Sequence, residues 1–145
     1  KLYLPHEPSG AYDFRVRFVR AEGDGIVSLI FRVDQVRCLW FVVMPGGKSH
    51  ITRQVNGRPV YVDDETHRLL GEFENGREYT ATLKVRDGSV SAFLDEALVV
   101  EWRVDHDQLR LSEGARSGIN RLGLMSQSPT EFLEAEVRIF DASRP

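Results

Sequence analysis

A two-residue turn constrains the fold of this chain more than any other feature. Asp87-Gly88 is a dipeptide that tolerates positive φ angles, and apolar residues alternate with polar ones on both sides of it. Outward pairing from the turn gives one apolar face: Val85 with Val90, Leu83 with Ala92, and Ala81 with Leu94. The other face is mostly polar: Lys84 with Ser91, Thr82 with Phe93, and Thr80 with Asp95. A half-buried antiparallel sheet requires this division, so residues 75–102 are predicted to form a curved β-meander.

The third strand of this meander is predicted to follow a three-residue loop, Asp95-Glu96-Ala97. That loop length sets Leu98, Val100 and Trp102 on the apolar side. We therefore expect Trp102 to be a core residue and not a ligand platform.

Further strands are predicted along the whole chain, separated by glycine, proline, asparagine and aspartate. They are Tyr12–Arg20, 25–33, Val36–Met44, 49–55, 119–127 and 133–139, in addition to the meander. About nine short strands at this spacing are typical of a two-sheet sandwich or jelly roll. Only residues 105–113 are compatible with a helical turn. The predicted fold class is all-β, a two-sheet antiparallel β-sandwich of the jelly-roll type, with residues 1–145 as one domain.

Charged residues alternate with apolar ones in both terminal strands. Arg15 and Arg17 lie on the polar face of the first, and Glu134 and Glu136 on the polar face of the last. If the two strands pair, these charges meet on the solvent side. Cross-strand ion pairs of this kind stabilise modestly and help to fix the register.

Composition excludes several classes of function. With 19 basic and 22 acidic residues, a net charge of −3 gives no electrostatic basis for nucleic-acid binding. No apolar run approaches the roughly 18 residues that cross a bilayer, so no membrane insertion is expected. The single cysteine, Cys38, excludes an internal disulfide, leaves the compartment open, and lies in an apolar strand as a buried thiol. Because the chain begins at Lys1 without methionine, we expect a domain excised from a longer protein or a processed product.

The order of these segments resembles the concanavalin A-like lectin/glucanase superfamily. It is most similar to laminin G-like domains and to the 3-keto-disaccharide hydrolase-like domains of planctomycete-type bacteria. The resemblance rests on the charged first strand YDFRVRFVR, a GDG turn, the meander NGREYTATLKVRDGSVSAFLDEALVVEW, and the closing INRLGLMSQSPTEFLEAEVRIF. It implies a sandwich in which one sheet is concave and often binds glycans. Two positions depart from the pattern: Glu96 replaces a turn glycine, and Arg77-Glu78 stands where tryptophan often precedes the meander.

Catalytic and metal-binding patterns are sparse. Glycosidases of this fold use paired carboxylates about 5 Å apart, and Glu134-Ala135-Glu136 is the nearest match. Because these glutamates are expected to pair with arginine, no catalytic residue is assigned. Asp63, Asp64 and Glu65 form an oxygen-rich loop that is the weak candidate for calcium, set against an ordinary solvated loop. No zinc-ligand spacing is present, and no other cofactor is predicted.

One face of the predicted second sheet mixes arginine, hydroxyl and aromatic side chains. If Asp34-Gln35 turns a hairpin, the strands on either side present Trp40 to the core, and the alternating positions face outward. The predicted ligand-binding residues on this face are Arg32, Arg37, Phe41, His50, Gln54 and Gln127. Polar groups would hydrogen-bond sugar hydroxyls while an aromatic ring stacks on the sugar. The alternative is that residues 61–74 cover this face and make it a second small core.

Three classes of function remain open. The first is a non-catalytic carbohydrate-binding or surface-recognition module, appended to a larger secreted or membrane-anchored protein. Its partners would be a glycan or polysaccharide and the neighbouring domains of the parent protein. The second is a glycoside-processing enzyme domain of the 3-keto-disaccharide hydrolase-like kind, which the missing paired carboxylates disfavour. The third is a protein-interaction or spacer domain, for which an exposed pair, Phe93 and Val99, would be the contact.

Overall fold

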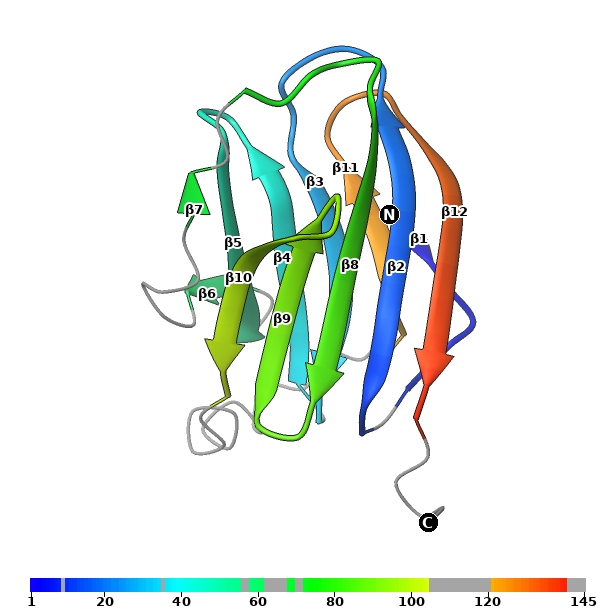
Figure 1. The fold of residues 1–145 in the computed structure, drawn as a ribbon, viewed down its shortest axis with the longest axis vertical. Coiled ribbons are helices and arrows are strands. Elements are labelled where there is room, and N and C mark those ends of the chain that lie inside the picture. Colours follow the sequence, from blue (N-terminus) through cyan, green and yellow to red (C-terminus); the bar gives the residue numbers. More distant parts are fainter. Residues whose placement is uncertain are drawn as a thin grey trace.

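The protein is a two-layer β-sandwich (Figure 1). A computed structural model describes residues 1–8, 10–34, 36–55, 58–61, 68–69, 72–104 and 121–140. The strands are β1 (Leu2–Tyr3), β2 (Tyr12–Arg20), β3 (Val27–Val33), β4 (Val36–Met44), β5 (Lys48–Val55), β6 (Arg58–Tyr61), β7 (Arg68–Leu69), β8 (Glu78–Arg86), β9 (Ser89–Leu94), β10 (Ala97–Arg103), β11 (Gly123–Ser126) and β12 (Thr130–Ile139). The predicted all-β class is confirmed. The helical turn considered at 105–113 falls outside the described residues.

The strands form two antiparallel sheets that stack face to face (Figure 1). The seven-stranded sheet has the order β1-β11-β3-β4-β5-β6, with β7 paired to β5. The five-stranded sheet has the order β10-β9-β8-β2-β12. The pairs that are consecutive in the chain are β3-β4, β4-β5, β5-β6, β8-β9 and β9-β10. By contrast, β2 pairs with β8, and β11 and β12 return from the end of the chain to pair with early strands. Sequence reasoning missed β1, β6 and β7, which are only two to four residues long.

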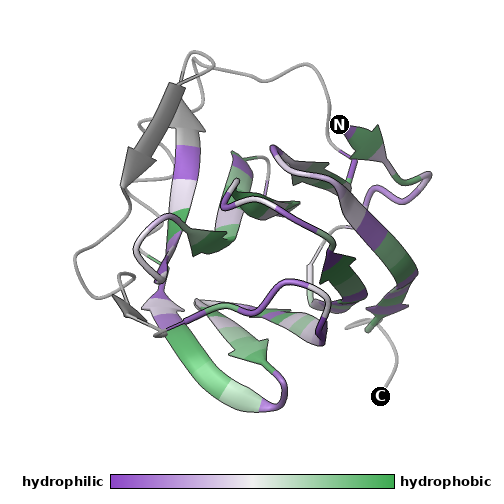
Figure 2. Ribbon diagram, turned by 90° about the horizontal axis from the view of Figure 1, so that it is seen from above, coloured by the Kyte–Doolittle hydropathy of each residue, from purple (hydrophilic) through white to green (hydrophobic). Residues whose placement is uncertain are grey.

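The core lies between the sheets because apolar residues alternate with polar ones along the long strands. Seen from above, hydrophilic and hydrophobic bands follow one another along the ribbon (Figure 2). Trp40 and Trp102 are both buried in this core, as predicted. The β3–β4 hairpin closes between Val33 and Val36, which confirms the turn at Asp34.

One hydrogen-bonded tyrosine joins the two sheets. The Tyr12 hydroxyl, on β2, donates to the carbonyl of Arg32 on β3 at 2.6 Å and accepts from the Arg32 N–H at 3.0 Å. Burial is the main cause that raises the pKa of Tyr12 above its usual range. Since the hydroxyl keeps its proton, it serves both bonds at once.

The meander differs from the prediction at its second turn. Asp95 and Glu96 both have positive φ, at 50° and 69°, and form a two-residue turn in which Leu94 pairs with Ala97. Leu98 therefore lies opposite Phe93 on the outer face, where it is 53% exposed. A bulge between Leu98 and Val100 restores the register and buries Val99. The three-residue loop and the inward Leu98 were wrong, whereas the core position of Trp102, which lies opposite Val90, is confirmed.

The terminal strands pair as expected. Arg17 lies opposite Glu134, and their Nη1 and Oε2 atoms are 2.6 Å apart; Arg15 lies opposite Glu136 at 4.0 Å. A bulge between Phe132 and Glu134 changes the apolar alternation, so that Phe132 opposes Phe18 and Leu133 is exposed. The strict alternation predicted for residues 133–139 would turn Leu133 toward the core, and at this residue it was wrong.

Candidate ligand-binding site

Polar side chains converge on the outer face of the seven-stranded sheet. Three cross-strand rows place them: Ser28 beside Phe41 and His50, Ile30 beside Leu39 and Thr52, and Arg32 beside Arg37. We call the non-aliphatic members of these rows the polar face: Ser28, Arg32, Arg37, Phe41, His50 and Thr52. The strand period predicted this grouping, because these positions alternate with the core set.

The polar face is buried in its middle and partly exposed elsewhere. His50 is 2% exposed, and Ser28 and Thr52 are buried as well, whereas Arg32, Arg37 and Phe41 are half-buried. The Phe41 and His50 rings meet edge to face, with centroids 5.0 Å apart. Buried residues in the middle of the face are what we expected from the alternative in which residues 61–74 cover it. Most of residues 61–74, its predicted cover, fall outside the described residues.

The N-terminal strand supplies one contact to this face. Tyr3 lies beside Gly123, where an added Cβ would approach the tyrosine ring to 3.1 Å. Glycine at this position leaves room for the ring to rest on the sheet. The Tyr3 hydroxyl accepts a hydrogen bond of 3.1 Å from Nη2 of Arg37, and the guanidinium lies 5.7 Å from the ring centroid. Arg37 is thereby held in one orientation with an aromatic ring beside it.

Three buried polar atoms of this face have no hydrogen-bond partner among the described residues. They are Ser28 Oγ, Thr52 Oγ1 and Arg37 Nε. A buried polar atom without a partner costs about 1–3 kcal/mol, so such atoms are few in folded proteins and call for an explanation. Two hydroxyls and one guanidinium N–H on adjacent strands match the hydrogen-bonding pattern of a polyhydroxylated ligand.

The remaining predicted residues are placed less centrally. Gln54 lies in β5 opposite Pro59, and its side chain is outside the described part. Gln127 follows β11 and is exposed; its Oε1 accepts from the Ile26 N–H at 3.4 Å. The structure therefore groups Arg32, Arg37, Phe41 and His50 on one face and puts Gln127 at the edge. The calcium candidates Asp63, Asp64 and Glu65 all lie outside the described residues.

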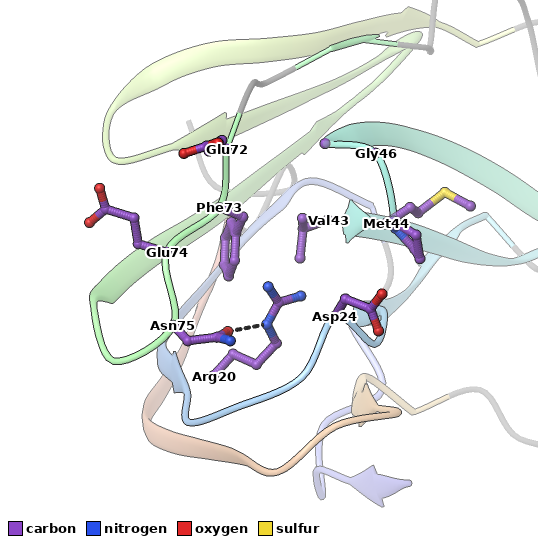
Figure 3. A pocket seen from close by; sticks show the side chains of 11 residues that line it. Arg20, Asp24, Val43, Met44, Gly46, Glu72, Phe73, Glu74 and Asn75 are labelled. Atoms are coloured by element: carbon purple, nitrogen blue, oxygen red, sulfur yellow. Dashed lines mark hydrogen bonds between the residues drawn. The ribbon is translucent and has the colours of Figure 1, made fainter.

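A second feature, which sequence reasoning missed, is a hollow of about 850 Å³ at the end of the sandwich (Figure 3). Its wall is formed by the end of β2, the β4–β5 turn and residues 72–75, and we call it the Arg20 hollow. Arg20 is 5% exposed; Nε donates to Asn75 Oδ1 at 2.6 Å and Nη1 to the Gly25 carbonyl at 3.0 Å. A signal existed in the sequence: the alternation of β2 puts Arg20 on the same buried face as Phe18.

Another hollow, of about 630 Å³, lies on the outer face of the five-stranded sheet. Its aromatic residue is Phe93, with Lys84 Nζ 5.0 Å from the ring centroid. The exposed neighbour of Phe93 is Leu98, which lies directly opposite it. Val99, predicted to be exposed with Phe93, is buried because of the bulge. That interaction surface is therefore corrected to Phe93 and Leu98.

Neither the carboxylates nor the thiol forms a catalytic arrangement in the described part of the chain. Glu134 and Glu136 face Arg17 and Arg15 across the outer surface of the five-stranded sheet. Burial raises the pKa of the Cys38 thiol to about 12, so it stays protonated at neutral pH. Within the described ranges, no cluster of three His, Cys, Asp or Glu residues is arranged to hold a metal ion, and no helix could cross a membrane.

Comparisons with known proteins identify the fold. No model of a protein family matches the sequence, and no curated protein matches it either. Among solved structures, the carbohydrate-binding module CBM66 from Bacillus subtilis is similar, with a TM-score of 0.66 and 14% identity over 90% of this chain and 76% of that one. Galectin LEC-6 of Caenorhabditis elegans is similar with a TM-score of 0.61 and 14% identity, over 93% of each chain. Chicken galectin 2 is similar with a TM-score of 0.63 and 8% identity, over 94% of this chain and 96% of the galectin.

At identities this low, the likeness shows the fold alone. The chain has the concanavalin A-like, jelly-roll sandwich of these lectins. The predicted two-sheet sandwich is thus confirmed as the fold, whereas membership of the concanavalin A-like superfamily stays a prediction. The laminin G-like or 3-keto-disaccharide hydrolase-like type stays a prediction.

Proposed function

We propose that this domain is a non-catalytic carbohydrate-binding module that uses the polar face of its seven-stranded sheet. One observation carries the proposal. Ser28 Oγ, Thr52 Oγ1 and Arg37 Nε are buried without a hydrogen-bond partner among the described residues, on a face that also presents a half-buried phenylalanine. The similar structures include a carbohydrate-binding module and galectins, which supports the same class of ligand.

The chemistry of the face suits a sugar. Arg37 and Arg32 donate hydrogen bonds to hydroxyl or carboxylate oxygens, and each serine or threonine hydroxyl can donate and accept. Phe41 lies two positions along the strand from Leu39 and offers an apolar surface to the C–H face of a ring. The two arginines favour an acidic or sulfated glycan, because guanidinium groups bind such anions in a bidentate manner. Affinity is modest, because polar contacts lose most of their gain to desolvation.

The finer parts of the proposal concern the whole protein. The domain, residues 1–145, belongs to a longer secreted or membrane-anchored protein, whose other domains are its neighbours. Gln54 and Gln127 extend the polar face at its edges. Asp63, Asp64 and Glu65 are the residues that would hold calcium if glycan binding requires it.

A second candidate function is protein interaction through the outer face of the five-stranded sheet. The observation that favours it is the pair of the half-buried Phe93 and the exposed Leu98, which lie opposite each other in adjacent strands. Neighbouring exposed apolar side chains are common at contact surfaces. The glycoside-processing alternative has weaker support, because each of the two candidate glutamates faces an arginine.

A glycan array tests the proposal when three proteins are compared. The parent is expected to bind a subset of glycans, and the double variant Arg37→Ala/Phe41→Ala is expected to lose them while its circular dichroism is unchanged. Lys84→Ala/Phe93→Ala is the matched control, since it removes one cation and one phenylalanine from the outer face of the other sheet. The array is then repeated in the presence of a chelator, which tests whether glycan binding requires calcium.

Two results would contradict the proposed site. Binding that survives the loss of Arg37 and Phe41 would place the ligand elsewhere. Loss of binding only in the Lys84/Phe93 variant would assign the ligand to the five-stranded sheet.

A further inference from the structure

The guanidinium of Arg20 is a buried charge that has no counter-ion among the described residues. The two groups that accept hydrogen bonds from it, the Asn75 amide oxygen and the Gly25 carbonyl, are both neutral. No carboxylate of a described residue lies within ion-pair distance of it, whereas five other ion pairs occur in the same set of residues. Burial of a charge is costly unless the charge is paired, so this arginine needs an explanation beyond packing.

The charge faces the Arg20 hollow. Figure 3 shows the guanidinium directed toward the centre of the hollow, between Phe73 and Asp24 on opposite walls. The carboxylates of Glu72 and Glu74 point away from it (Figure 3). A volume of about 850 Å³ is within the range of small-molecule sites. The carboxylates of Glu72 and Glu74 are thus turned to solvent, and Arg20 presents a cation to the interior, with Asp24 on the opposite wall.

The guanidinium is also held in place before any ligand arrives. It lies 4.8 Å from the centroid of the Phe73 ring, and the Phe73 ring stacks on the Tyr79 ring with centroids 4.0 Å apart. The guanidinium of Arg77 in turn lies 4.4 Å from the centroid of the Tyr79 ring. Asn75, which accepts from Arg20, donates in turn to the Gly23 carbonyl at 2.9 Å. A side chain fixed by stacking and hydrogen bonds loses little entropy on binding, which strengthens the contacts it makes.

We propose that the Arg20 hollow is a second binding site that takes the carboxylate of an acidic sugar. Arginine has five N–H donors, and the two bonds to Asn75 and Gly25 leave about three for a carboxylate. A guanidinium fork matches carboxylate geometry, and Asp24 across the hollow can accept from sugar hydroxyls. The anion chemistry rests on Arg20, whereas the choice of a sugar as its carrier rests on the proposed glycan-binding function.

A titration of the parent protein followed by NMR tests this site without any variant. The Nε–H signal of Arg20 is the reporter, because its bond to Asn75 protects it from exchange. D-Glucuronate is expected to shift this signal with an affinity at least fivefold higher than that of D-glucose or acetate. Equal responses to glucuronate and glucose, equal responses to glucuronate and acetate, or no shift at Arg20 would each overturn the proposal.

Charge variants provide the second test and avoid any loss of folding. Glu72→Gln/Glu74→Gln removes two exposed negative charges from the rim and should tighten glucuronate binding about two- to threefold at low salt. Glu134→Gln/Glu136→Gln changes the net charge equally on the outer face of the five-stranded sheet and should have a smaller effect. An equal or opposite effect of the two double variants would refute a carboxylate ligand at Arg20.

The experiments distinguish the failure of one proposed site from the failure of the other. If the Arg37/Phe41 variant keeps the glucuronate response at Arg20 but loses its array ligands, both proposals stand. If the array shows no glycan binding at the polar face while Arg20 still responds to glucuronate, the proposed function of that face fails alone. If Arg20 does not respond but the array binding depends on Arg37, the second site fails alone.

Discussion

The substitution Tyr12→Phe removes the hydroxyl that bridges the two sheets. In the parent this hydroxyl is buried, donates to the Arg32 carbonyl at 2.6 Å, and accepts from the Arg32 N–H at 3.0 Å. Each bond contributes about 0.5–1.5 kcal/mol, and a buried group that loses its partner costs about 1–3 kcal/mol. Phenylalanine keeps the ring packing, so the change isolates the hydrogen bonds. We expect the free energy of unfolding to fall by about 2–4 kcal/mol.

Urea unfolding followed by circular dichroism measures this loss. For a chain of this size it corresponds to a decrease of about 6–12 °C in melting temperature. Tyr3→Phe is the control, because its hydroxyl accepts one bond from Arg37 and the side chain is only partly buried; it should cost less than about 1 kcal/mol. A Tyr12→Phe variant within about 0.5 kcal/mol of the parent would refute the bridging role.

Three further predictions concern the register, the charged pairs and the thiol. Trp102→Ala should lower the free energy of unfolding by about 3–5 kcal/mol, whereas Leu98→Ala should change it by less than about 0.5 kcal/mol; equal effects in urea unfolding would contradict the bulge. Glu134→Gln/Glu136→Gln should leave the melting temperature within about 3 °C of the parent, because the pairs are exposed. If the parent hydrolyses a glycoside and this variant does not, the enzyme alternative replaces the binding module. Burial raises the pKa of Cys38 from 9.0 to about 12, so the unfolded chain ionises first and stability should fall as pH rises from 9 to 12. Cys38→Ala should show a shallower fall, and an unchanged alkaline slope would argue against a buried neutral thiol.

The sequence predicted the architecture because the strand period is visible wherever one face is buried. β4 was predicted to the residue, and the contact of Arg17 with Glu134, expected if the terminal strands pair, is present between β2 and β12. The errors fall where one extra residue changes the face. The bulges near Val99 and Leu133 are set by tertiary pairing, and no local pattern of residues marks them.

The candidate sites were predictable to different degrees. Alternation alone grouped Arg32, Arg37 and Phe41, since a shared face follows from the period of the strand. The burial of His50 depends on what lies over the sheet, which alternation does not encode. The Arg20 hollow brings together β2 and residues 72–75, which are about 50 positions apart in the sequence. Only the tertiary fold places Phe73 against Arg20.

The most direct test of glycan binding at the polar face is a backbone NMR titration with the strongest ligand from the array. The proposal predicts that shift changes concentrate in β4 and β5, around Arg37, Phe41 and His50, and that they are lost in the Arg37→Ala/Phe41→Ala variant. Changes confined to residues 63–67 would instead favour a calcium-dependent site formed by Asp63, Asp64 and Glu65. Changes centred on Phe93 would assign recognition to the five-stranded sheet, and either result would contradict the account.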